Sequence, residues 1–264
     1  MPANHRIITI ARLALLACTG CISNEFDEAP LAMACEVGVV RGHTRADVEE
    51  VARLAGQLDP AVKEIVRPRQ TPPLRIVVVP QHPRRPDATT MFEMRPNTGA
   101  IRQFIAIRID GSGPRRFLLA HELVHWYADW AWDHLPIAVE EGMADLVAAQ
   151  LSPELGALRR VMLMHHKPTV PDIRRMLEVE RGTERGLDWR SREMLYLVGR
   201  QVAERIGIDR LRSWCLTAEA TGSGHIPLEW LLDPSAAPAS AERHAQHQDA
   251  PRFEDAGAKR ERNL

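Results

Sequence analysis

The segment FLLAHELVHWYADWAWDHLPIAVEEGMADL, from Phe117 to Leu146, decides how this chain is interpreted. It is among the most apolar stretches of the sequence, yet it contains three histidines, three glutamates and three aspartates. A helix that is apolar on nearly every side is a buried helix. Burying unpaired ionisable groups costs several kcal/mol. The sequence therefore predicts that some of these groups share a partner inside the protein.

Within this segment, His121, Glu122 and His125 form an H-E-x-x-H motif on a helix predicted over residues 114–132. Histidines four residues apart project from the same face of a helix, and at this spacing two neutral imidazoles bind one tetrahedral Zn²⁺. Zinc lowers the pKa of a coordinated water to about 7, so Glu122 can act as the general base. The alternative is a pair of core histidines bonded to backbone carbonyls.

A zinc site with two histidines needs a third protein ligand. The metzincin pattern requires glycine at position 128 and histidine at position 131, and the chain has Ala128 and Ala131 there, which excludes that pattern. The other arrangement uses a glutamate on a following helix. The sequence predicts such a helix over residues 137–151, after a proline, and it offers Glu140 and Glu141.

The stretch LPIAVEEGMADLVA resembles the second active-site helix of the gluzincins, the thermolysin and aminopeptidase-type zinc metallopeptidases, and especially the bacterial peptidase MA-like families. That helix carries its ligand in the pattern E-G-x-A or E-x-x-x-D. Glu141 fits both forms, whereas Glu140 fits neither. The resemblance implies that Glu141 is the third ligand and that Asp145 accepts a hydrogen bond from a ligand histidine's second nitrogen. The alternative for Asp145 is an exposed surface aspartate.

Gluzincins usually add a tyrosine or histidine from a later helix to hold the oxyanion. The resemblance suggests Tyr196 for this role, on a helix predicted to begin after Asp188; a core tyrosine is the alternative. Tyr127 lies about 200° from His125 around the helix axis, so we expect it to point away from the zinc. His225 is a weaker candidate.

The other ionisable residues of the opening segment are interpreted as lying on the turn between the two helices or on the outer face of the second helix. Aspartate and histidine favour such turns. These residues are Asp129, Asp133, His134 and Glu140. The neighbouring histidines His165 and His166 are likewise interpreted as part of a loop.

The residues before the motif predict a small mixed β-sheet with at least one covering helix. The expected elements are a strand over residues 35–40, a helix capped by Thr44, a buried strand over 74–80, and a strand pair within 90–110. After Gly113 the pattern is helical. The predicted fold class is therefore α+β, and the resemblance implies a zincin-like fold. In that fold, the strand IRQFIAIRI before the motif is hypothesised to be the edge strand that pairs with an extended substrate peptide.

The first 18 residues are interpreted as a leader, because basic residues precede an apolar run too short to span a bilayer. LLAC, ending at Cys18, resembles the lipobox of bacterial lipoproteins, which implies export and membrane anchoring through a lipidated Cys18. Ordinary secretion and a cytosolic leader are the alternatives. We expect a linker over 19–34, the catalytic domain over 35–232 and a disordered tail over 233–264.

Two further cysteines, Cys35 and Cys215, lie within the expected catalytic domain. They can form a disulfide if the chain is exported to an oxidising compartment. Equally, both can be small buried residues without a covalent partner. The sequence leaves these two interpretations open.

The composition is that of an ordinary globular protein, with 45% hydrophobic and 26% charged residues and a formal net charge of −1. Nothing in this charge indicates a nucleic-acid partner. The sequence predicts an exported zinc metallopeptidase that acts on a peptide or protein substrate. The alternatives are a zinc hydrolase acting on other acyl groups and a non-catalytic metal-binding interaction module. An intact Glu122 argues against the module, because a structural site needs no base.

Overall fold

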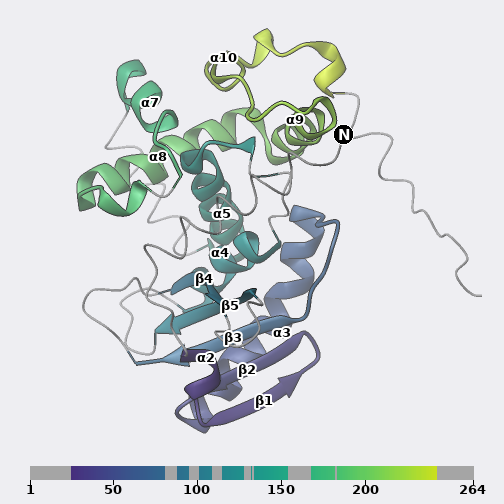
Figure 1. The fold of residues 1–264 in the computed structure, drawn as a ribbon, viewed down its shortest axis with the longest axis vertical. Helices are drawn as coiled ribbons and strands as arrows, with labels where there is room; N and C mark the ends of the chain where they lie inside the picture. The colour runs from purple at the N-terminus through teal and green to yellow at the C-terminus, as the bar shows by residue number, and fades with distance from the viewer. Residues whose placement is uncertain are drawn as a thin grey trace, which may run out of the picture. The chain divides into compact units, whose positions relative to one another are not determined.

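The chain forms two compact units (Figure 1). The first comprises Met1–Asp129 and Glu141–Thr169, and the second comprises Trp130–Glu140 and Val170–Leu264. The computed structural model describes residues 25–80, 88–94, 101–108, 115–127, 132, 134–153, 168–181 and 183–242. Strands and helices are both present, which confirms the α+β class.

A five-stranded mixed sheet forms the centre of the first unit, in the order β1-β2-β3-β5-β4. The two outer pairs, β1 with β2 and β4 with β5, are antiparallel, whereas β2 with β3 and β3 with β5 are parallel. The small mixed sheet and the predicted strand pair are thereby confirmed. The strands are β1 (Leu31–Cys35), β2 (Gly38–Gly42), β3 (Leu74–Val79), β4 (Ala88–Met94) and β5 (Ile101–Arg108).

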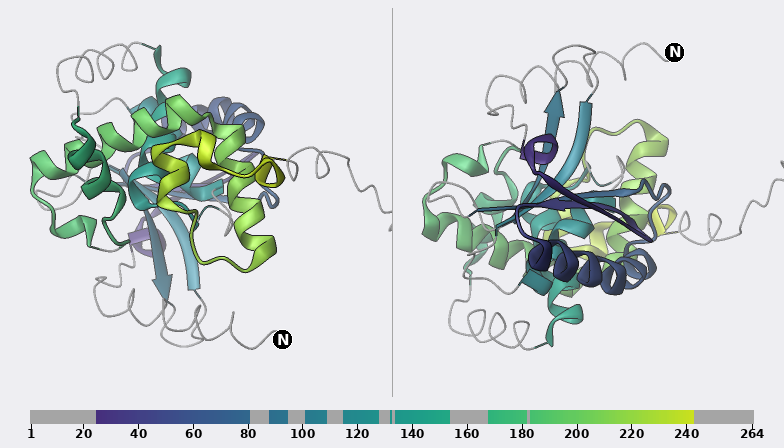
Figure 2. Two further views of the ribbon diagram at one scale, coloured as in Figure 1. Left: turned by 90° about the horizontal axis from the view of Figure 1, so that it is seen from above. Right: turned by 90° about the horizontal axis from the view of Figure 1, so that it is seen from below.

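One long helix, α3 (Arg45–Val66), packs against β1, β2 and β3 and lies along one face of the sheet (Figure 2). It begins at the predicted cap, where the backbone N–H of Asp47 donates to Thr44 Oγ1 at 3.2 Å. The apolar positions that the helical spacing predicts are all buried: Val48, Val51, Leu54, Ala55 and Leu58.

The central strand β3 is buried on both faces of the sheet. Successive residues of a strand point to opposite sides, so Ile76 and Val78 face one way and Val77 and Val79 the other. All four are buried. Val77 and Val79 pack in a cluster with Phe26, which lies on the short helix α2 (Glu25–Glu28).

The start of the described chain corrects two expectations. Residues 25–35 contain α2 and β1 instead of a linker, and the strand expected over 35–40 is a hairpin of two strands. The hairpin depends on Gly38, where the backbone comes so close to β3 that a Cβ would lie 2.1 Å from the carbonyl oxygen of Leu74. The backbone also bonds here, from Leu74 N to Val37 O at 2.9 Å.

The structure also corrects the expectation that IRQFIAIRI, which contains β5, is an edge strand that pairs with the substrate peptide. β5 is hydrogen-bonded to β3 on one side and to β4 on the other. It therefore has no free backbone edge on which a peptide could add as a further strand. The edge strands of the described sheet are β1 and β4.

Helices make up the described part of the second unit. α8 begins at the predicted cap, where Ser191 N donates to Asp188 Oδ1 at 2.7 Å, and it ends at the predicted Gly207, with φ of 90°. The longer helices of this unit are α7 (Val170–Leu177), α8 (Trp189–Ile206), α9 (Ile208–Thr221) and α10 (Leu228–Leu232).

The described chain also continues past residue 232, where we expected disorder. Two short 3-10 helices, Pro234–Ala236 and Ala239–Glu242, follow α10. Ser213 Oγ donates to the carbonyl of the buried Ala241 at 2.6 Å, so a hydroxyl on α9 holds a segment that has no hydrophobic periodicity. Residues 243–264 lie outside the described residues.

The predicted leader, including Cys18, lies outside the described residues. Among the helices that are described, none is long and apolar enough to cross a membrane. No disulfide joins Cys35 and Cys215. The interpretation of Cys215 as a small buried residue is confirmed.

Replacing Gly38 with alanine should lower the free energy of unfolding by at least about 2 kcal/mol, because the new Cβ must displace backbone atoms of β3. Urea denaturation measures this change. Gly56→Ala is the matched control: it lies in α3 with nothing within 4 Å of a new Cβ, and it should stabilise the protein by roughly 0.5–1 kcal/mol. Equal effects of the two substitutions would contradict the close approach at Gly38.

Candidate metal centre

Two helices of the opening segment carry the candidate ligands. α4 (Arg115–Tyr127) holds both histidines, and α5 (Ile137–Leu151) holds Glu141. α5 has the bounds that the sequence predicts, whereas the described part of α4 ends at Tyr127. Arg116, near the start of α4, donates from Nε to the carbonyl of Leu151 at the end of α5, at 3.0 Å. This bond joins the start of α4 to the end of α5, so the two helices run antiparallel.

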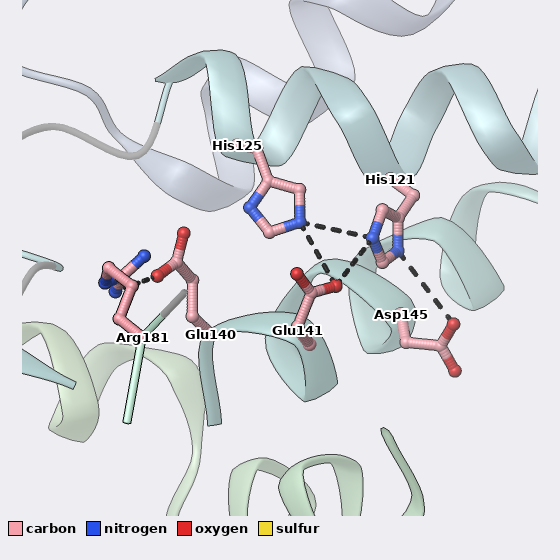
Figure 3. Close-up of polar contacts among 6 residues, drawn as sticks. All are labelled: His121, His125, Glu140, Glu141, Asp145 and Arg181. Carbon is pink, nitrogen blue, oxygen red and sulfur yellow. Dashed lines mark hydrogen bonds and ion pairs between the residues drawn. The ribbon is translucent and has the colours of Figure 1, made fainter. Parts of the chain in front are cut away.

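The three predicted ligands converge on one point (Figure 3). His121 Nε2 lies 3.1 Å from His125 Nε2 and 3.1 Å from Glu141 Oε2. His125 Nε2 lies 3.5 Å from the same glutamate oxygen. These three atoms form a group that could hold a metal ion. Their side chains are mostly buried, with 11%, 13% and 18% of their surface exposed.

The size of this triangle fits a tetrahedral metal ion. Zinc binds histidine nitrogen and carboxylate oxygen at about 2.0–2.2 Å, and tetrahedral angles then place neighbouring ligand atoms about 3.3 Å apart. The observed separations of 3.1, 3.1 and 3.5 Å lie on both sides of this value. Two neutral imidazoles and a carboxylate are also a donor set that zinc accepts. The residues present therefore fit the ion that the motif predicts.

Glu141 is ionised in this setting. Burial by itself favours the neutral acid. In the metal-free protein, the positive charge of His125 and His121 in their protonated forms, together with their hydrogen bonds to the carboxylate, outweighs burial and lowers the pKa of this carboxyl well below its usual range. A deprotonated carboxylate is the form that binds a metal ion.

Asp145 lies one helical turn after Glu141 and is buried, so the alternative of an exposed surface aspartate is wrong. Its Oδ1 lies 3.9 Å from Nδ1 of His121, the ring nitrogen that does not face the triangle (Figure 3). This separation is within the range of an ion pair but longer than a hydrogen bond. Asp145 thus faces the second ring nitrogen of His121, as the resemblance implies, but the two atoms are too far apart for the expected hydrogen bond.

The predicted base, Glu122, lies on α4 between the two histidines and is buried. Residues of a helix follow one another at about 100°, so Glu122 is displaced by about 60° from His125 around the helix axis. Glu122 therefore places a buried carboxylate beside the face of α4 that carries the two histidines.

The opposite side of α4 is fixed to α3. Tyr127 points away from the ligands, as predicted, and its hydroxyl donates to the buried carboxylate of Asp59. Lys63 Nζ pairs with the same carboxylate at 2.8 Å and lies 5.2 Å from the centre of the Tyr127 ring. Burial and the bond to Asp59 raise the pKa of Tyr127. Because Tyr127 lies about 200° from His125, anchoring it sets the rotation that turns the histidines toward α5.

Glu140 corrects another expectation. We expected it on the turn or the outer face, but it is buried and forms a hydrogen-bonded ion pair with Arg181 (Figure 3). Arg181 is 41 residues further along the chain. No local pattern connects the two residues, so the sequence alone did not identify Arg181.

The other candidates belong to the second unit or lie outside the described residues. Tyr196 lies on α8 with intermediate exposure, and His225 is exposed. His134 lies on the connection before α5, as predicted, and its Nδ1 bonds to the carbonyl of Gly224 at 3.1 Å. Outside the described residues are Asp129, Asp133, His165 and His166.

No protein-family model matches the chain, and neither a curated protein nor a solved structure matches it. The resemblance to gluzincins therefore depends on the motifs between His121 and Asp145. Within this segment, the structure brings together the two histidines and Glu141.

Replacing Glu141 with glutamine should weaken zinc binding by more than about 100-fold, because it removes the only charged ligand of the group. Competition with a chromophoric chelator measures the Kd, and metal analysis after dialysis measures the zinc content. Glu64→Gln, an exposed site on α3, is the matched control and should bind zinc like the wild type. Unchanged zinc affinity in the Glu141 variant would contradict this assignment.

Replacing Tyr127 with phenylalanine should lower the free energy of unfolding by about 1–3 kcal/mol, because Asp59 stays buried and loses a donor. Urea denaturation of the metal-free protein measures the change. The double variant Tyr127→Phe with Asp59→Leu should be less destabilised than the sum of the two single variants. Strict additivity would show that the two side chains do not interact.

Proposed function

We propose that this chain is a zinc-dependent peptidase of the gluzincin type. The observation that carries the proposal is the triangle of His121 Nε2, His125 Nε2 and Glu141 Oε2, formed by an H-E-x-x-H helix and a following helix. Its size and donor set suit zinc, and the motif also supplies a base, Glu122, which a purely structural site does not need.

The residues have separate roles in this proposal. When bound, zinc lowers the pKa of a water to about 7 and polarises the scissile carbonyl. His121 and His125 would hold the ion through Nε2, and Asp145 would favour the proton on Nδ1 of His121, so that Nε2 carries none. The Glu122 carboxylate takes a proton from the attacking water and passes it to the leaving amine nitrogen.

The surroundings of the site support this chemistry because they are apolar. A low local dielectric strengthens the interaction of fixed charges with the developing charge of the transition state. Apart from Asp145, the side chains on α4 and α5 that are at most 1% exposed are all apolar: Leu119, Ala120, Leu123, Val124, Ala138, Val139, Met143, Ala144, Val147 and Ala148.

The proposal includes a zincin-like fold of the peptidase MA-like kind, and it retains Tyr196 as the residue that stabilises the oxyanion. In this proposal, the strand that binds the substrate peptide is β4 instead of β5. This strand is an edge of the sheet, runs antiparallel to β5 and packs against α4. Addition of an extended substrate peptide to such an edge supplies main-chain hydrogen bonds.

Export and anchoring complete the proposal. The apolar run and the LLAC sequence ending at Cys18 support a lipidated, exported protein that acts on peptides or proteins outside the cytoplasm. The near-neutral net charge of −1 gives no support to a nucleic-acid partner.

Replacing Glu122 with glutamine should leave zinc bound and lower peptidase activity by about 10²–10⁴-fold, because the amide cannot accept the proton. Zinc content and cleavage of casein and of a peptide library are the measurements, with Glu64→Gln as the control. A zinc-loaded wild type that cleaves no peptide but hydrolyses esters would favour the non-peptide hydrolase. Zinc binding without any hydrolysis would favour the interaction module.

A further inference from the structure

The ion pair between Glu140 and Arg181 does not enter the proposed chemistry. The Glu140 side chain is 10% exposed and that of Arg181 is 38% exposed, so the carboxylate is the buried partner. Arg181 follows α7 in the chain and donates from Nη2 to Glu140 Oε2. A buried carboxylate is tolerated only when it is paired, and removing one partner of such a pair is far more costly than removing both.

The position of Glu140 makes this pair relevant to the metal. Glu140 lies in the first turn of α5 and directly precedes the ligand Glu141. The boundary between the two units falls between these two residues, so the beginning of α5 belongs to the second unit and the ligand to the first. A shift of the first turn moves the backbone that carries the ligand oxygen.

A second connection holds the chain before α5. His134 Nδ1 bonds to the carbonyl of Gly224, and Ile226 N donates to the carbonyl of His134, both at 3.1 Å. This connection does not involve Arg181. The segment before α5 therefore keeps these two bonds when Arg181 is replaced, and the effect of the Glu140–Arg181 pair on the first turn of α5 can be tested by itself.

We propose that Arg181 is a positioning residue for the metal ligand Glu141 and acts through Glu140. The inference rests on the proposed metal centre. Removal of the guanidinium takes a charged hydrogen-bond partner from the buried Glu140 carboxylate. This loss favours movement of the carboxylate toward water, and the first turn of α5 moves with it. Glu141 Oε2 then leaves the position 3.1 Å from His121 Nε2 that the metal centre requires.

The test is the zinc affinity of Arg181→Gln, measured by competition with a chelator. We expect the Kd to rise about tenfold, as for other residues that orient metal ligands. The double variant Glu140→Gln with Arg181→Gln should recover most of the affinity, because it removes the buried charge of Glu140 together with the guanidinium. Arg181→Lys should also retain more affinity than Arg181→Gln. The control is Arg175→Gln, which breaks an exposed pair with Asp172 on α7 and should leave the Kd unchanged.

The outcomes separate this inference from the proposed function. A wild type that binds no zinc would refute the metal centre itself. A wild type that binds zinc, with Arg181→Gln binding equally well, would overturn only the role of Arg181. Equal losses in Arg181→Gln and in the double variant would also overturn it, because the charge of Glu140 would then not be the cause. Thermal unfolding of the zinc-free variants identifies any loss of affinity that comes from unfolding.

Discussion

Two imidazole nitrogens and one carboxylate oxygen face one another within 3.5 Å inside an apolar pair of helices. In the absence of an ion, only shared protons can keep these electron-rich atoms so close together. A metal ion satisfies all three at once, and it requires each of them to be directed at the same point. In the proposed metal centre, α4 and α5 must therefore keep a fixed rotation and a fixed separation.

Different interactions fix the two helices. Tyr127 binds Asp59 on the back of α4, and this contact directs the histidines toward α5. Arg116 ties the start of α4 to the end of α5, and Arg181 holds Glu140 at the other end of α5. Each of these side chains lies away from the three ligand atoms. In the proposed metal centre, the positions of the three ligand atoms thus depend on side chains that do not bind the ion.

The parts of this arrangement that depend on local spacing could be predicted from the sequence. The H-E-x-x-H motif, the caps at Thr44 and Asp188, and the bounds of α5 all follow from residues within one or two helical turns. The burial of Glu140 could not be predicted, because its partner is 41 residues away. The internal position of β5 and the order after residue 232 were missed for the same reason: both depend on contacts with distant segments.

The division of α5 between the two units bears on how this protein can change over generations. Where a domain boundary falls in a loop, recombination can exchange or delete one domain and leave the other intact. Here the boundary separates Glu140 from Glu141, inside a continuous helix. A crossover there would cut the helix beside the candidate ligand Glu141, so exchange of either unit alone would break α5.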